Sequence, residues 1–306
     1  MEKEIIVSID CASYNHKDYI AHTIESFLMQ KTSFRYEILI HDDASDDGTA
    51  EIIAEYEKEH PDLIKVIYQT ENQYSQGVRV EQFNHERATG KYIAICEGDD
   101  YWTDPYKLQK QVEYMEKHPE CSLCVHGANR VSAVTGAVLS RIRPRRGDGL
   151  LSMEEVIEGG GAFFATNSMM YVKDKVLSLP SFYEDTGVGD YPLTIYLAHK
   201  GTIYYIDEIM SAYQVDVKGS WTEREFSQIP KKIRHYEKIA VMLDEFNRFT
   251  DFKYSDAIKR AKMRNHFYLL LEQRKFLECF KGGYGELYLK FRFLSKAVKK
   301  RVFNFL

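Results

Sequence analysis

Two acidic turns carry the residues of this sequence that are best suited to chemistry. Glu97-Gly98-Asp99-Asp100 follows an apolar run, Tyr92 to Cys96, which is typical of a buried strand. Asp42-Asp43 follows a similar run, Tyr36 to Ile40. Carboxylates this close together repel one another and resist burial, so such turns are stable when they bind a cation or stay open to water. Each turn taken alone is compatible with a metal site and with a solvated acidic loop.

The elements around these turns alternate between strand and helix patterns. Short apolar runs predict four strands, each followed by a helical pattern, at 5–9, 36–40, 63–68 and 92–96. This alternation indicates a mostly parallel sheet with helices on both faces. In such a sheet the carboxyl ends of the strands meet at one edge, so the two acidic turns can face one crevice. Cys11 to His16 is expected to be a loop, and Asp104-Pro105 is expected to begin a helix.

The second half of the chain shows more strands and then only helices. We expect a strand at 121–127, a hairpin at 131–142 that turns at Thr135-Gly136, and strands at 166–172, 203–206 and 209–215. A helix is expected to begin at Asp190. From about Thr222 the apolar residues recur at helical spacing. The sequence therefore predicts a catalytic domain over residues 1–222 and a helical region over residues 223–306.

Glycine-rich phosphate loops are missing from the sequence. Neither Gly-x-Gly-x-x-Gly after the first strand nor Gly-x4-Gly-Lys-Ser/Thr occurs. A divalent ion held by carboxylates is the remaining way to neutralise a bound diphosphate. Two acidic turns at equivalent strand ends therefore favour a site for a cation together with a hydrogen-bonding ligand.

Five stretches, in this order and spacing, resemble the family 2 glycosyltransferases. They are Val7-Ser8-Ile9 with Ser13-Tyr14-Asn15, Ile40 to Ser45 with Asp47-Gly48-Thr49, Gly90 to Ile93, Glu97 to Asp100, and Gly189 to Leu193. The resemblance covers roughly residues 4–222. It implies the GT-A nucleotide-diphospho-sugar transferase fold, an α/β fold with a mostly parallel central sheet flanked by helices, here with a C-terminal helical extension.

The resemblance also implies a nucleotide-sugar site with a metal ion. The Asp-x-Asp motif of the family is replaced here by Glu97-Gly98-Asp99, so that Glu97 would face the ribose and Asp99 would hold Mn2+ or Mg2+, with Asp100 sharing the metal. Asp216 is a candidate for a third metal ligand. The other implied donor-binding residues are Ala12, Ser13, Tyr14 and Asn15 against the nucleotide base, Asp43 hydrogen-bonded to that base, and Arg79 near the nucleotide.

Asp190 matches the general base of the family, with Glu184 and Asp185 as the alternatives, although its place at a helix start equally suits an N-cap. A sugar hydroxyl is a poor nucleophile until a base takes its proton. A metal on the far side of the anomeric carbon would stabilise the diphosphate leaving group, and this arrangement inverts the anomeric centre. The expected activity is sugar transfer from a nucleotide-diphosphate donor, with UDP favoured, to a saccharide or lipid-linked acceptor in bacterial surface polysaccharide synthesis.

Two other functions fit parts of the pattern. A sugar-1-phosphate nucleotidyltransferase also binds a nucleotide and a metal, but it would normally have a glycine-rich, basic loop after the first strand, whereas Cys11 to Asn15 contains neither glycine nor lysine. A nucleotide-sugar-binding module without activity is the non-enzymatic alternative. Loss of donor hydrolysis in Asp99→Ala would exclude that module.

Two basic segments remain outside this site. Four arginines between Arg141 and Arg146 form a cationic loop, which is either solvated or a site for a phosphate-bearing acceptor or lipid head group. Residues 284–306 carry aromatic and aliphatic residues at helical spacing between lysines and arginines. This pattern predicts a helix that either lies on a membrane surface or packs on the catalytic domain or in a homodimer interface.

Composition limits the remaining classes of function. The 306 residues have a net charge of −5, which argues against a general nucleic-acid binder. The five cysteines are an odd number without disulfide-like spacing, and Cys121 and Cys124 lack the second pair that a zinc site needs. No signal peptide is evident, and no run reaches the roughly 20 apolar residues of a membrane span. We expect a cytoplasmic protein, peripheral on the inner face of the plasma membrane if the C-terminal helix binds lipid.

Overall fold

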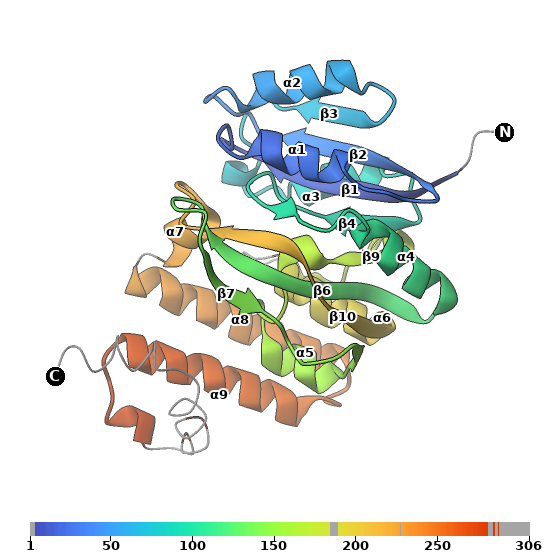
Figure 1. Cartoon of the computed structure of the whole chain (residues 1–306). Helices are drawn as coiled ribbons and strands as arrows, with labels where there is room; N and C mark the ends of the chain where they lie inside the picture. The colour runs from blue at the N-terminus through green and yellow to red at the C-terminus, as the bar shows by residue number, and fades with distance from the viewer. Residues whose placement is uncertain (1–3, 184–188, 227, 281–283, 285–286, 288–306) are drawn as a thin grey trace. The chain divides into compact units, whose positions relative to one another are not determined.

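The computed structural model describes residues 4–183, 189–226, 228–280, 284 and 287. The chain divides into two compact units (Figure 1). The first consists of Met1–Pro180 with Asp190–Lys218, and the second of Ser181–Gly189 with Gly219–Leu306. The predicted helix at 284–306 and the alternative bases Glu184 and Asp185 lie outside the described residues.

The first unit is built on one mixed sheet. Its strand order is β3-β2-β1-β4-β9-β6-β10-β5, and β7 and β8 pair with β6 and β10. The strands within the described residues are β1 (Ile5–Ser13), β2 (Arg35–Asp42), β3 (Ile64–Tyr68), β4 (Tyr92–Ile95), β5 (Tyr101–Trp102), β6 (Cys121–Ser132), β7 (Val138–Ile142), β8 (Gly149–Leu151), β9 (Met170–Val172) and β10 (Thr202–Val215).

The four strands β1 to β4 are parallel, as the sequence predicted. The apolar side chains of β1, β2 and β4 are mostly buried on both faces, which is the reason that these strands read as continuous apolar runs. The edge strand β3 is only partly buried. The predicted loop at Cys11 to His16 is partly wrong, because β1 continues to Ser13 and stays paired with β2 up to Ser13 opposite Asp42. Cys11 is buried in the core, and Ala12 and Ser13 after it continue the pairing with β2.

The second half of the sheet mixes strand directions. β9 is inserted between β4 and β6 and runs antiparallel to both. Residues 166–172, expected to form one strand, instead begin with a 3-10 turn at Thr166–Ser168. The two strands expected between 203 and 215 form the single long strand β10, which is parallel to β6 with register shifts around Ile206 and Ile209. The predicted hairpin is confirmed: β6 and β7 pair, and Gly136 at the turn has a φ of 67°.

Helices cover this sheet. α3 packs against β1 and β2, α4 against β6, and α6 against β6 and β10. The helix expected at Asp104-Pro105 begins two residues later, because the Asp104 carboxylate accepts the backbone N–H of Tyr106 in a turn before the helix. The helices of the first unit are α1 (Ile20–Leu28), α2 (Thr49–Glu59), α3 (Glu81–Arg87), α4 (Lys107–Lys117), α5 (Met153–Gly159) and α6 (Asp190–Lys200).

The second unit is helical in its described part, as expected. It contains α7 (Trp221–Phe226), α8 (Ile229–Phe249) and α9 (Ser255–Glu272). α8 and α9 pack against each other, and Phe182 contacts Phe246 and Phe249 of α8 edge-on. Among the described residues, no helix combines the length and the apolar character required to cross a membrane.

Candidate active site

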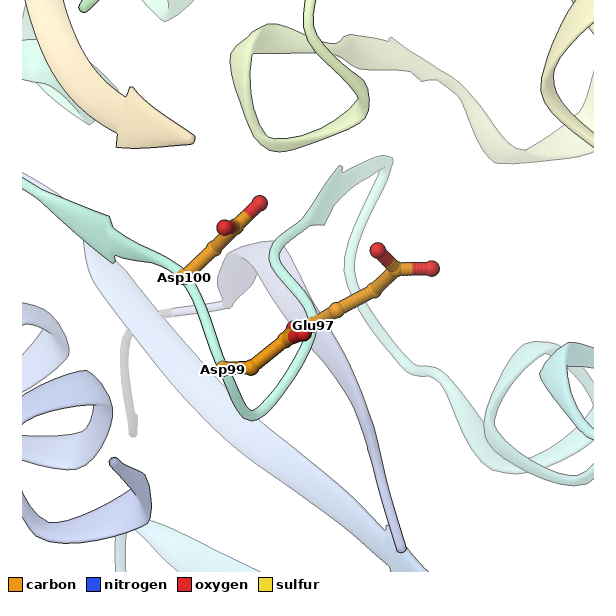
Figure 2. Close-up of side chains that lie close together, drawn as sticks. All are labelled: Glu97, Asp99 and Asp100. Carbon is orange, nitrogen blue, oxygen red and sulfur yellow. The ribbon is translucent and has the colours of Figure 1, made fainter. Parts of the chain in front are cut away.

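The acidic turn follows β4 and projects three carboxylates (Figure 2). Ligand oxygens of Glu97, Asp99 and Asp100 all lie within 4.8 Å of one another. Gly98 is required at this turn, since a Cβ there would stand 2.7 Å from Ser13 Oγ and 2.8 Å from His16 Nδ1. The close packing of the turn on the end of β1 therefore places the carboxylates beside the first loop.

The predicted nucleotide-binding residues at the end of β1 adjoin this turn. Ala12 accepts the backbone N–H of Gly98 at 2.9 Å. Tyr14 is 38% exposed and is available to a ligand. Asn15 adopts a positive φ of 56°, and its amide is engaged with Asp46 at 2.9 Å. Ala12 and Ser13 thus adjoin the turn, whereas the Asn15 side chain is directed to the loop after β2.

Asp43 lies at the same edge of the sheet. Its backbone N–H donates to Ser13 at 2.9 Å, so the two acidic turns flank the end of β1 as expected. Its carboxylate is buried and accepts the backbone N–H groups of Gln73 and Tyr74 at 2.7 and 3.1 Å. Asp43 therefore shapes the segment before the 3-10 turn Tyr74–Gln76, and its carboxylate has remaining lone pairs for a ligand.

Asp100 is fixed on both carboxylate oxygens. Oδ1 accepts the backbone N–H of Gln214 at 2.7 Å, and Oδ2 accepts the Asn167 amide at 3.0 Å. Asn167 is itself fully buried, and its side-chain polar atoms are all paired. Its side-chain amide also donates to the carbonyl of Ala212, its side-chain oxygen accepts from Ser211, and its backbone carbonyl accepts the indole N–H of Trp102. This network joins the acidic turn to β5 and β10.

The three carboxylates of the turn are electrostatically strained. Loss of hydration, and then the negative charges of Asp99 and Asp190, raises the pKa of Glu97, although the residue is accessible to water. Burial, and then the charges of Asp99 and Glu97, raises the pKa of Asp100. A divalent cation would relieve this repulsion, and carboxylate oxygens are the ligands that Mg2+ and Mn2+ prefer. The donor set therefore fits such a metal.

Asp190 is the first residue of α6. Its Oδ1 accepts the backbone N–H of its neighbour Tyr191 at 2.7 Å, which pairs one of the N–H groups of the first helical turn. Burial raises the pKa of Asp190 to about 6. Its charge contributes to the raised pKa of Glu97, which places the two carboxylates within electrostatic range of each other. Gly161 adjoins it: a Cβ at that glycine would lie 3.5 Å from Asp190 Oδ2.

Arg79 lies in the segment before α3. Its Nε and Nη2 donate to Glu81 Oε1 at 3.0 and 2.9 Å. Glu81 in turn contributes to the raised pKa of Glu97, so the pair lies within electrostatic range of the acidic turn. The guanidinium is paired within its own segment.

Two residues near the site, His16 and Asp10, were not predicted from the sequence. His16 Nδ1 lies 3.3 Å from Ser13 Oγ, and its Nε2 lies 3.9 Å from Asp99 Oδ2. Asp10 is buried in β1, where it accepts from Asn84 at 2.7 Å and lies 3.1 Å from His85 Nε2. For Asp10, the only sign in the sequence was that a charged residue stands inside an apolar strand. Asp216, the candidate third metal ligand, is exposed at a positive φ of 66° after β10.

Comparison with known proteins identifies the family. Residues 8–178 match the family described as Glycosyl transferase family 2, which is more than half of the chain. The chain belongs to this family, as its motifs indicated.

Several curated proteins are similar to this chain. The uncharacterized protein Rv1520 of Mycobacterium tuberculosis is 37% identical over 220 residues, which is 70% of this chain and 60% of that protein. The chain thus spans about 60% of the length of this relative. The putative teichuronic acid biosynthesis glycosyltransferase TuaG of Bacillus subtilis is 41% identical over 110 residues, 36% of this chain and 42% of TuaG. The UDP-Glc:alpha-D-GlcNAc-diphosphoundecaprenol beta-1,3-glucosyltransferase WfaP of Escherichia coli is 38% identical over 112 residues, 36% of this chain and 41% of WfaP.

Solved structures share the fold at low sequence identity. The mannosyltransferase PcManGT of Pyrobaculum calidifontis, in complex with GDP-Man and Mn2+, aligns with a TM-score of 0.62 at 16% identity over 99% of this chain and 84% of its own. S. aureus TarS 1-349 in complex with UDP-GlcNAc aligns with a TM-score of 0.53 at 16% identity over 87% of this chain and 80% of its own. The predicted GT-A fold is confirmed.

Proposed function

We propose that this protein is an inverting, metal-dependent glycosyltransferase. It moves a sugar from a nucleotide-diphosphate donor to a hydroxyl of a saccharide or lipid-linked acceptor in bacterial surface polysaccharide synthesis. The observation that carries the proposal is the cluster of Glu97, Asp99 and Asp100 at the carboxyl end of β4, in a chain of this family, with Asp190 in electrostatic range.

The donor would occupy the edge of the sheet between the two acidic turns. Ala12, Ser13 and Tyr14 would lie against the base, with Asp43 as the hydrogen-bonding partner of the base and Glu97 near the ribose. Asp99 would be the main metal ligand, because its carboxylate lacks the two backbone and amide donors that engage Asp100. A bound Mn2+ or Mg2+ would supply positive charge to the diphosphate leaving group.

Asp190 would remove the proton of the acceptor hydroxyl. A base is most effective when its pKa lies near the working pH, and burial moves Asp190 in that direction, to about 6. Since the base and the metal ligands stand on different elements, α6 and the turn after β4, they can address opposite sides of a sugar between them. This arrangement supports a single displacement with inversion.

The relatives support the choice of donor and pathway. WfaP is by name a UDP-Glc-dependent glucosyltransferase acting on a diphosphoundecaprenol-linked sugar, and TuaG is assigned to teichuronic acid biosynthesis. TarS 1-349 binds UDP-GlcNAc. We therefore favour a UDP-sugar donor, a lipid-linked acceptor and a cytoplasmic location close to the membrane. Homodimerisation stays a prediction.

A donor screen with Mn2+ tests the proposal. Thermal stability of the full chain is measured against a panel of UDP-, GDP- and dTDP-sugars with Mn2+, and hydrolysis of the stabilising donor is then followed. We expect Asp99→Ala to lower hydrolysis on the order of a thousandfold, because the leaving group loses its metal. Asp18→Ala changes an exposed carboxylate outside the acidic turns and is the matched control. Equal hydrolysis by the Asp99→Ala variant and the wild type would refute the metal assignment.

A further inference from the structure

His16 stands beside Asp99, in the loop that joins β1 to α1. Its Nε2 lies 3.9 Å from Asp99 Oδ2, and the two side chains are 16% and 15% exposed, so that both can be reached by a small ligand. The separation is too long for a hydrogen bond between the ring and the carboxylate. It suits two atoms that bind one ion, because ligand atoms about 2.1 Å from a small divalent cation stand at most about 4.2 Å apart.

The other ring nitrogen of His16 has a neighbour that fixes the ring. Nδ1 lies 3.3 Å from Ser13 Oγ, which can accept its N–H. A histidine that binds a metal almost always donates its second ring N–H to such an acceptor, and this sets the tautomer and the direction of the ring. In that tautomer the lone pair belongs to Nε2, the atom beside Asp99. Within the described part of the chain, no hydrogen bond engages this atom.

The backbone of His16 is held by the protein alone. Its N–H donates to Thr49 Oγ1 at 2.9 Å. Its carbonyl accepts the N–H groups of Tyr19 and Ile20, at 2.9 and 2.8 Å, where α1 begins. The ring also packs on the acidic turn, since a Cβ at Gly98 would stand 2.8 Å from Nδ1. Residues held in this way make a preorganised site.

We propose that His16 Nε2 and the Asp99 carboxylate bind the metal ion together, and that the imidazole makes the site prefer Mn2+ to Mg2+. Asp100 contributes less, because donors already engage both of its oxygens. Mg2+ takes oxygen ligands, whereas transition ions also accept imidazole nitrogen. The inference rests on the proposed metal-dependent function and adds a nitrogen ligand that the acidic turn does not supply.

A protonated His16 that serves only as the counter-charge of Asp99 is the alternative. The two roles predict effects of opposite sign. A cationic ring would compete with the metal, so its removal would raise the affinity for Mn2+. Removal of a ligand lowers that affinity. The affinity of a variant without the ring therefore decides between the two roles.

Electron spin-echo spectroscopy of Mn2+ bound to the full chain tests the proposal directly. The probes are Mn2+ alone and Mn2+ with UDP. Imidazole nitrogen bound to Mn2+ modulates the echo, so the wild type should show this nitrogen modulation and His16→Ala should lose it. His60→Ala removes a histidine at the C-terminal end of α2 and is the matched control, which should keep the modulation.

Calorimetric titration with Mn2+ and with Mg2+ measures the metal preference. His16→Ala should lower Mn2+ affinity on the order of 100-fold and Mg2+ affinity less, so that the preference for Mn2+ shrinks. Ser13→Ala keeps the ligand but removes the acceptor of Nδ1. It should lower Mn2+ affinity about tenfold while the nitrogen modulation remains.

The outcomes separate this inference from the proposed function. Mn2+ bound to the wild type without nitrogen modulation would overturn the role of His16 and leave metal dependence standing. Higher Mn2+ affinity in His16→Ala would make His16 a counter-charge and would overturn the proposal as well. Absence of Mn2+ binding, with and without UDP, would overturn both the role of His16 and the proposed metal dependence.

Discussion

The acidic turn and the start of α6 present carboxylates in contrasting ways. In the turn, Glu97 and Asp100 have raised pKa values because of both loss of hydration and the charge of Asp99. At α6, burial alone raises the pKa of Asp190, and the helix backbone opposes that shift. A cation can relieve like-charge repulsion, whereas a carboxylate whose pKa is raised by desolvation is relieved by taking up a proton. The contrast is the one that the proposed metal site and the proposed base require.

Removing the base should separate binding from chemistry. We expect Asp190→Asn to lower kcat on the order of a thousandfold, since general-base catalysis is lost, while donor affinity stays within a factor of about two. Asn can still accept the N–H of Tyr191, so the helix start is kept. Single-turnover transfer and calorimetric donor titration measure the two effects. Normal turnover by this variant would move the base elsewhere.

Removing a hydrogen bond that holds the Asp100 carboxylate should have a smaller effect than removing the base. Asn167→Ala removes the amide that holds Asp100 Oδ2, so Mn2+ affinity should fall about 10- to 100-fold. The same change leaves buried partners unsatisfied and should cost about 2 kcal/mol of stability. Ser211→Ala removes the hydroxyl that donates to Asn167 without touching Asp100 and serves as the control. Equal Mn2+ affinity in both variants would show that Asn167 is only structural.

The smallest effect is expected in the pH dependence of kcat/KM. A base must be deprotonated, so kcat/KM should fall about tenfold per pH unit below the Asp190 pKa of about 6. Asp190→Asn should abolish this acid limb.

The raised pKa of Asp190 affects stability in the opposite direction to activity: deprotonation is required for catalysis but lowers the free energy of unfolding. The folded pKa of Asp190 is raised from 3.8 to about 6, so its contribution to stability is present below pH 3.8 and is lost as pH rises through 6. The Asn variant should therefore unfold with a free energy about 3 kcal/mol higher at pH 7, measured by denaturant titration. An Asn variant less stable than the wild type at pH 7 would contradict this assignment.

The parallel half of the fold could be predicted from the sequence, because β1, β2 and β4 bury most of both faces and β2 and β4 end in recognisable acidic turns. The antiparallel insertion of β9 was not, since strand direction depends on partners such as Leu123, distant in sequence. Likewise the acidic turn was evident, but the role of Asn167 was not. That residue contacts Asp100 from 67 positions away, and an isolated asparagine in a sequence carries no signal of its partner.

The backbone of the acidic turn has a thermodynamic consequence. Thr23 Oγ1 on α1 lies 2.6 Å from the carbonyl of Asp100 and 3.0 Å from that of Gly98, while the Gly98 N–H binds Ala12. The conformational entropy of the turn is therefore lost when the protein folds and need not be lost again when an ion arrives. Ion binding should therefore carry only a small penalty in conformational entropy from the backbone of the turn.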